Sequence, residues 1–108
     1  MENIETVSIN TEWLPLGTGI AGIVNAIAFD SQGNLYAGGD FTAAGGTPAL
    51  RLAVWNGTSW SAFGSGVYGL VGDNPQIYSI LTVGQKLYVA GRFTSIDGVS
   101  ANSIAVYE

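Results

Sequence analysis

The sequence contains no cysteine and no histidine among its 108 residues. The first absence excludes disulfides, thiolate nucleophiles and Cys-ligated zinc, and the second excludes a Ser-His triad and His-ligated metals. Two carboxylates such as Asp73 and Asp97 could still act as a general acid and a general base, but nothing in their spacing requires this role. We therefore expect no metal, no cofactor and no enzymatic activity.

Positive charge and long apolar runs are also scarce. Three basic residues stand against eight acidic ones, for a net charge of -5. This balance opposes binding to phosphate backbones and anionic lipids. No stretch approaches the roughly 18 apolar residues of a membrane helix, and residues 1–10 lack the apolar core of a signal peptide. We expect a soluble chain that binds neither nucleic acid nor membrane.

The residues that are present favour an all-β fold. The chain is 47% apolar and holds 16 glycines, which favours short elements and frequent turns. The apolar stretches are rich in β-branched and aromatic residues and are bounded by turn formers, and their connections are too short for helical crossovers. We expect antiparallel strands at residues 24–29, 35–39, 51–55, 60–63, 77–83, 86–90 and 103–107.

Two segments of the chain repeat. Residues 13–19 return as residues 60–66, which lie 47 positions later. Residues 36–55 align without a gap on residues 88–107, which lie 52 positions later, with eight identities. The offset grows mainly because the second copy contains an inserted segment, residues 70–75, while the turn at residues 30–34 is one residue longer in the first copy. The chain therefore contains two copies of one unit.

Both faces of the predicted sheets are apolar. Residues 26–29, 52–55 and 104–107 are apolar at successive positions, whereas a sheet with one wet face alternates. Small four-stranded antiparallel sheets that repeat about every 50 residues and are covered on both faces are typical of β-propeller blades.

The residues also resemble the kelch-like propeller repeats of bacterial and fungal surface proteins. The likeness covers residues 12–108 and rests on the pattern Trp-x-x-Leu-Gly-x-Gly from Trp13, on the double glycine at residues 38–39 and on a tryptophan that opens the fourth strand. The second copy departs from the pattern at residues 90–91 and at Tyr107. The resemblance implies a propeller of extracellular or cell-surface origin, and it says more about fold than about function.

The repeat offsets predict how the chain is divided. Residues 1–11 form an N-terminal extension, residues 17–63 form blade one, and residues 64–108 form blade two with three strands. The fourth strand of a blade leads into the first strand of the next, so residues 12–16 are predicted to complete a neighbouring chain's second blade by pairing with residues 103–107. Two blades leave broad apolar faces exposed, so we expect a homo-oligomer: a six-bladed trimer first, an eight-bladed tetramer second. The alternative is an excised or engineered fragment of a longer propeller.

Eight residues are expected at the subunit interface. Asp40 and Arg92 occupy equivalent positions, so a ring alternates their charges, and an exposed pair of this kind contributes about 0–1 kcal/mol. The apolar members lie in the first and last strands, and the full set is Trp13, Leu14, Leu16, Asp40, Arg92, Ile104, Val106 and Tyr107.

A ligand site is expected on the face that holds the long loops, at residues 17–23, 40–50, 64–76 and 92–102. An aromatic ring near carboxylate and amide groups suits stacking on and hydrogen bonding to a sugar. The function expected is a self-assembling, lectin-like module that binds glycans multivalently. The alternative is a purely structural assembly module, such as a surface-protein segment, with no ligand. The candidate ligand residues are Tyr68, Asp73, Asn74 and Asp97.

Overall fold

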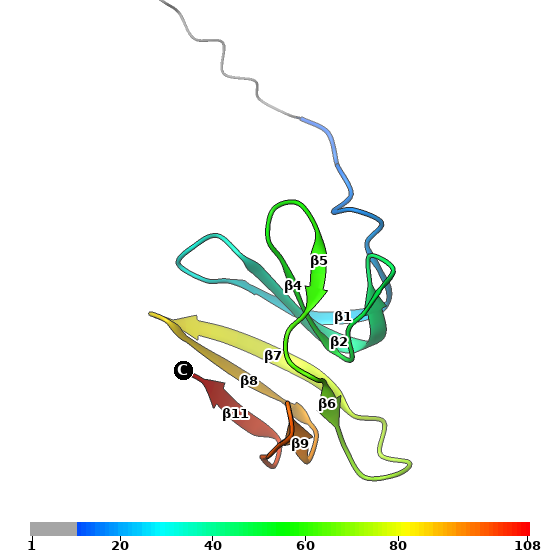
Figure 1. Cartoon of the computed structure of the whole chain (residues 1–108), viewed down its shortest axis with the longest axis vertical. Coiled ribbons are helices and arrows are strands. Elements are labelled where there is room, and N and C mark those ends of the chain that lie inside the picture. Colours follow the sequence, from blue (N-terminus) through cyan, green and yellow to red (C-terminus); the bar gives the residue numbers. More distant parts are fainter. Residues whose placement is uncertain (1–10) are drawn as a thin grey trace, which may run out of the picture.

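A computed structural model describes residues 11–108, and this part of the chain is all-β (Figure 1). Its strands form antiparallel sheets and none of these residues is helical, so the all-β part of the predicted fold class is confirmed. Residues 11–108 accordingly provide no helix that could cross a membrane. The predicted extension lies outside the described residues except for Thr11.

The first copy of the repeat, which we call unit one, is a sheet with the strand order β1-β2-β4-β5. A short strand, β3, pairs with the far end of β2. Side chains fix the two tight turns: the carboxylate of Asp30 accepts the amide of Asn34, and Oδ1 of Asn56 accepts the amide of Ser59. The bounds are β1 (Ile20–Phe29), β2 (Leu35–Ala44), β3 (Thr47–Pro48), β4 (Leu52–Trp55) and β5 (Trp60–Ala62).

The second copy, unit two, is divided between two sheets. The larger has the order β7-β8-β11 and the smaller has the order β6-β9-β10. The smaller sheet corresponds to the start of β1 and the β2–β3 hairpin of unit one, and the inserted residues 70–75 separate β6 from β7. The bounds are β6 (Val67–Tyr68), β7 (Gln76–Val83), β8 (Lys86–Arg92), β9 (Ser95–Ile96), β10 (Val99–Ser100) and β11 (Ile104–Tyr107).

The two units have the same backbone geometry at equivalent positions. The amide of Gly39 donates to the carbonyl of Arg51, and 52 residues later the amide of Gly91 donates to the carbonyl of Ser103. Arg51 and Ser103 both adopt a positive φ, at 71° and 70°. Such a φ is uncommon outside glycine, so its recurrence shows that the sequence repeat is a structural repeat.

All four segments predicted as long loops contain strand residues. Residues 17–23 hold the start of β1, and residues 64–76 hold β6. Residues 40–50 hold the end of β2 and all of β3, and residues 92–102 hold β9 and β10. The composition of residues 40–50 favours a loop, but Gly45 and Gly46, with φ of 58° and 80°, form a tight turn that makes the segment a hairpin. The strand predicted at residues 24–29 begins earlier, at Ile20, because its first residues pair with the extended end of β2.

Unit one packs face to face on unit two, with β1 and β2 against β7 (Figure 1). Polar side chains tie the units together along this contact. Nδ2 of Asn25 donates to the carbonyl of Ile77 at 2.7 Å, and Oγ1 of Thr82 donates to the carbonyl of Phe29 at 2.7 Å. The core between the inner faces consists of Leu52, Val67, Ile77, Ile80, Leu87, Val89 and Phe93.

Each unit has a second face that points away from the other unit, which we call its outer face. On unit one, Ile27 and Phe29 of β1 are about 60% exposed, at 60% and 61%. On unit two, Leu81 and Val106 flank Tyr88 and are 59% and 43% exposed. Because side chains alternate along a strand, the same strands carry apolar residues on both faces. Each unit buries its inner face and leaves several large apolar side chains of its outer face exposed, while part of the outer face of unit one is already covered by Trp60.

Residues 12–16 have no strand partner among the residues that the structure describes, 11–108. Trp13 is 100% exposed and Leu14 is 62% exposed. The free edge of β11 also has no partner among residues 11–108. The predicted pairing of these two segments between chains therefore stays a prediction.

Candidate functional site

Two of the predicted ligand residues are linked at the β6–β9 edge. Tyr68 lies in β6 with half of its side chain exposed, and its hydroxyl donates to the carbonyl of Ser65 at 3.4 Å. The amide of Ser65 donates to Oδ1 of Asp97 at 2.8 Å. Asp97 lies in the β9–β10 turn with a φ of 51°, and its own amide donates to the carbonyl of Gly66. Asp97 therefore holds the backbone of residues 64–66 through two hydrogen bonds.

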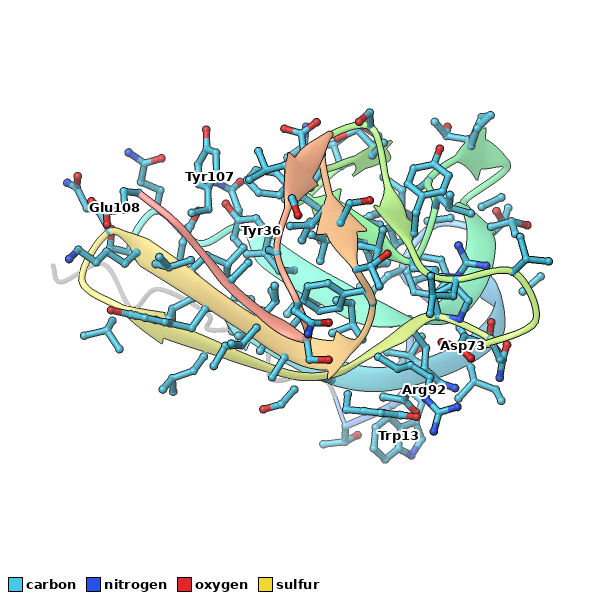
Figure 2. All side chains as sticks on the ribbon, turned by 90° about the horizontal axis from the view of Figure 1, so that it is seen from below. Trp13, Tyr36, Asp73, Arg92, Tyr107 and Glu108 are labelled. Atoms are coloured by element: carbon cyan, nitrogen blue, oxygen red, sulfur yellow. The ribbon has the colours of Figure 1, made fainter. Side chains whose placement is uncertain are left out.

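The other two predicted ligand residues belong to a separate group in the inserted segment. Nη1 of Arg92 donates to the backbone carbonyl of Asp73 at 3.2 Å, and Figure 2 shows both residues at one end of the view. Asn74 follows in a turn, with a φ of 54°. No hydrogen bond within residues 11–108 joins this group to Tyr68 or Asp97.

A polar cavity of about 200 Å³ lies between the 30–34 turn of unit one and the 83–86 turn of unit two. The sequence does not reveal this cavity, because its residues are about 50 positions apart and lie on the tight turns rather than on the long loops. One signal was available, since the 30–34 turn is one residue longer than its counterpart. The lining includes Asp30, Ser31, Tyr36, Gln85, Lys86 and Tyr107.

The carboxylate of Asp30 organises one wall of this cavity. It accepts hydrogen bonds from the amides of Gln32 and Asn34, from Nδ2 of Asn34 at 2.9 Å and from the hydroxyl of Tyr36 at 3.0 Å. The side-chain bond from Asn34 is the main cause that holds the pKa of Asp30 below its ordinary value of 3.8. The group is therefore an anion near neutral pH.

Tyr36 forms the back of the cavity. Desolvation by burial, followed by the hydrogen bond to Asp30, raises the pKa of Tyr36 above its ordinary value of 10.0. Its ring meets that of Phe63 edge to face at 5.1 Å, and Phe63 meets Tyr107 in the same way at 4.9 Å. Figure 2 shows Tyr36 and Tyr107 on the same side of the molecule. The row of rings fixes an aromatic surface beside polar groups.

A second, apolar cavity of about 240 Å³ lies between the inner faces, toward the free edge of β11. Unit one contributes Leu52 and Phe63. Unit two contributes Val89, Ile96, Asp97, Val99, Ala105 and Tyr107, among others. Asp97 is thus the one predicted ligand residue that lines a cavity described here, and that cavity is apolar.

The predicted interface residues are placed as follows. Ile104 and Val106 lie on the outer face of unit two, and both are exposed. Tyr107 points to the inner side, where its ring contacts Phe63 of the same chain. Within one chain the partner of Arg92 is the carbonyl of Asp73, so the alternating charge pair with Asp40 stays a prediction about the assembled ring.

Among residues 11–108, no three His, Cys, Asp or Glu side chains gather in an arrangement that could hold a metal ion. Comparison with protein-family models, with curated proteins and with solved structures finds no match to this chain.

Proposed function

We propose that copies of this chain assemble head to tail into a closed β-propeller, and that the ring acts as a lectin-like module with repeated glycan sites. Units one and two are then two blades of the ring. Three chains give six blades and four give eight, and both lie in the usual range of about four to eight blades. Six blades is the favoured size.

The interface between the units inside one chain carries the proposal. The inner face of unit one presents Tyr36, and the outer face of unit two presents Tyr88 at the equivalent position. The inner face of unit two carries Val89, and its equivalent, Ala37, lies on the outer face of unit one, where it is already buried in the Trp60 cluster. Each outer face therefore repeats one half of an interface that the chain already makes.

The exposed side chains supply a driving force for this contact. Burying a large apolar side chain stabilises by about 1.5–3 kcal/mol, and Ile27, Phe29, Leu81 and Val83 are all more than half exposed. Because the two outer faces differ, they pair head to tail rather than face to identical face. Contacts of this kind close into a ring when the rotation per chain allows it.

The polar cavity supports the binding part of the proposal. It combines an anionic carboxylate, the Lys86 ammonium, amide groups and tyrosine rings, which are the groups that bind and orient sugar hydroxyls. The equivalent turn of unit two, residues 83–86, has no aspartate, so each chain supplies one such cavity. A ring then offers several identical sites, and weak affinities combine.

Light scattering on the 108-residue chain tests the assembly. We expect a mass of about three 11.2 kDa chains, and Phe29→Asp, which places a charge on the outer face of unit one, should give a smaller species. Val71→Asp is the matched control, because Val71 is fully exposed in the inserted segment and should leave the mass unchanged. A folded 11.2 kDa wild-type chain with native β-sheet circular dichroism would falsify the ring.

A glycan array on the assembled protein tests the binding, and two double variants locate it. Gln85→Ala/Lys86→Ala alters the polar cavity and should weaken glycan affinity at least about tenfold. Tyr68→Ala/Asp73→Ala alters the loop surface and should leave affinity unchanged. The reverse pattern moves the site to the loop surface that the sequence predicts.

A purely structural ring is the second candidate. It is favoured by the four hydrogen bonds that the Asp30 carboxylate already accepts within the chain, three from its own turn and one from Tyr36, since these explain the residue without a ligand. An assembled protein that binds nothing on the array supports this candidate.

A further inference from the structure

The surroundings of Trp60 in unit one provide a template. Its side chain is only 9% exposed and packs in a cluster with Ala37, Ala44 and Ala53. The ring of Trp55 lies 5.4 Å away. The indole Nε1 donates to the carbonyl of Leu16 at 3.0 Å, so the polar end of the buried ring is satisfied.

In unit two the equivalent positions surround a cavity instead of a tryptophan side chain. The residues 52 positions after Ala37, Ala44, Ala53 and Trp55 all line the apolar cavity, which lies at the free edge of β11. They are Val89, Ile96, Ala105 and Tyr107.

The residue that would fill this cavity by equivalence is Trp13. It lies 47 positions before Trp60, in the repeated segment, and in the single chain it is 100% exposed (Figure 2). It is therefore not seated in its own chain's cavity. Meanwhile Leu16, three residues later, is held at unit one by the indole of Trp60.

We infer that the apolar cavity is the socket for Trp13 of a second copy of this chain, an inference that rests on the proposed ring. The β4–β5 register sets the pairing: Ala53, Val54 and Trp55 face Ala62, Ser61 and Trp60. Shifted by the two repeat offsets, Ala105, Val106 and Tyr107 of one copy face Pro15, Leu14 and Trp13 of the next. The indole of Trp13 then stacks beside Tyr107 as Trp60 does beside Trp55.

The size of the cavity is compatible with this occupant. An apolar cavity of about 150 Å³ accommodates benzene, and the present one is about 240 Å³. Its walls are bulkier than those around Trp60. Asp97 stands at the position equivalent to Gly45, and a Cβ on Gly45 would lie only 2.8 Å from Cδ1 of Trp60, which is too close. The Trp13 ring must therefore sit farther from Asp97 and closer to Leu52 and Phe63 than strict equivalence places it.

Cysteine cross-linking tests the register, and the absence of native cysteine makes the result unambiguous. Leu14→Cys/Val106→Cys should form disulfides between chains, seen as covalent multimers on a non-reducing gel, because directly opposed side chains lie about 4.5–5.5 Å apart. Val54→Cys/Ser61→Cys is the positive control within one chain. Leu14→Cys/Ala105→Cys is one residue out of register and should not cross-link.

A second measurement tests the socket itself. In the assembled protein Trp13 should be shielded from quenching by iodide, so Trp13→Phe should remove part of the tryptophan fluorescence that iodide does not quench. Separately, Trp13→Ala should raise the dissociation constant of the ring at least about 100-fold, because a buried ring is lost. A Leu14–Val106 disulfide within one chain overturns the inference, as does an intact ring in which Trp13 is quenched freely. A chain that stays monomeric by light scattering overturns the proposed ring as well.

Discussion

Single glycines determine how closely the strands approach. A Cβ on Gly39 would collide with the backbone carbonyl of Ile23 in the neighbouring strand, and a Cβ on Gly91 would collide with that of Gln76. These two glycines are equivalent in the repeat. Gly39 is therefore a requirement of β1–β2 packing, and this second glycine of the pair is the one retained in the second copy. Gly38 has a different role, because a Cβ there would collide with the side chain of Ile77 in unit two.

Gly39→Ala should destabilise the chain by about 3 kcal/mol or more, because the obstructing atom is backbone and cannot move aside. Urea unfolding followed by circular dichroism measures the loss. Gly33→Ala is the control: no atom lies within 4 Å of its Cβ, and only its positive φ of 88° is strained, at about 1–2 kcal/mol. Equal losses in the two variants would contradict the collision.

Tyr36 should make stability fall at alkaline pH. Its pKa is raised in the folded chain, so folding favours the protonated hydroxyl, and this contribution is complete below about pH 10 and is lost as the pH rises through the folded pKa. Tyr36→Phe should therefore lose less stability between pH 8 and pH 11 than the wild type does, in urea unfolding at both values. An unchanged slope in Tyr36→Phe would show that the hydroxyl is not responsible.

At the scale of elements, the sequence predicts the longer strands and misses the short ones. Alternating and clustered apolar residues mark β1, β2, β7 and β8, and the central residues of these strands lie within the predicted ranges. The strands β3, β6, β9 and β10 have two residues each, and their segments contain glycine, proline or polar residues. Their pairing is set by turn geometry at positive φ, which composition does not reveal.

The candidate site was less predictable than the strands. Tyr68 and Asp73 are close in sequence, but the inserted segment turns Asp73 toward Arg92 at the edge of β8. The polar cavity depends on two turns brought together by packing of β1 against β7, which is tertiary information. Local sequence cannot specify a contact between residues about 50 positions apart.

Deleting residues 1–16 should dissociate the ring or cause aggregation through the open edge of β11. Loss of a buried tryptophan alone costs about 3–5 kcal/mol, and an exposed strand edge is a template for pairing with other chains. Light scattering reports both outcomes. Deletion of residues 1–10 retains Trp13 and should keep the wild-type mass. A ring of unchanged size and melting temperature after the longer deletion would exclude residues 12–16 as the closing strand.

At the scale of the whole molecule, the two units share the core between their inner faces, and each leaves large apolar side chains exposed on its outer face. Assembly into the proposed ring would therefore stabilise the folded chain by mass action. We expect the melting temperature to rise by about 4–8 °C for a tenfold increase in protein concentration, which corresponds to about 1 kcal/mol per chain. Differential scanning calorimetry at three concentrations measures it. A melting temperature independent of concentration would contradict coupling between folding and assembly.

The difference between the two outer faces has a genetic consequence. A chain damaged only at Leu81 retains the outer face of unit one, so in the proposed ring it would join wild-type chains and break the junction made by its own unit two. With equal amounts of the two chains, random mixing leaves only about one ring in eight free of the variant if three chains make a ring. One altered allele would therefore disable most of the product of a normal one, so substitutions on this face behave as dominant rather than recessive.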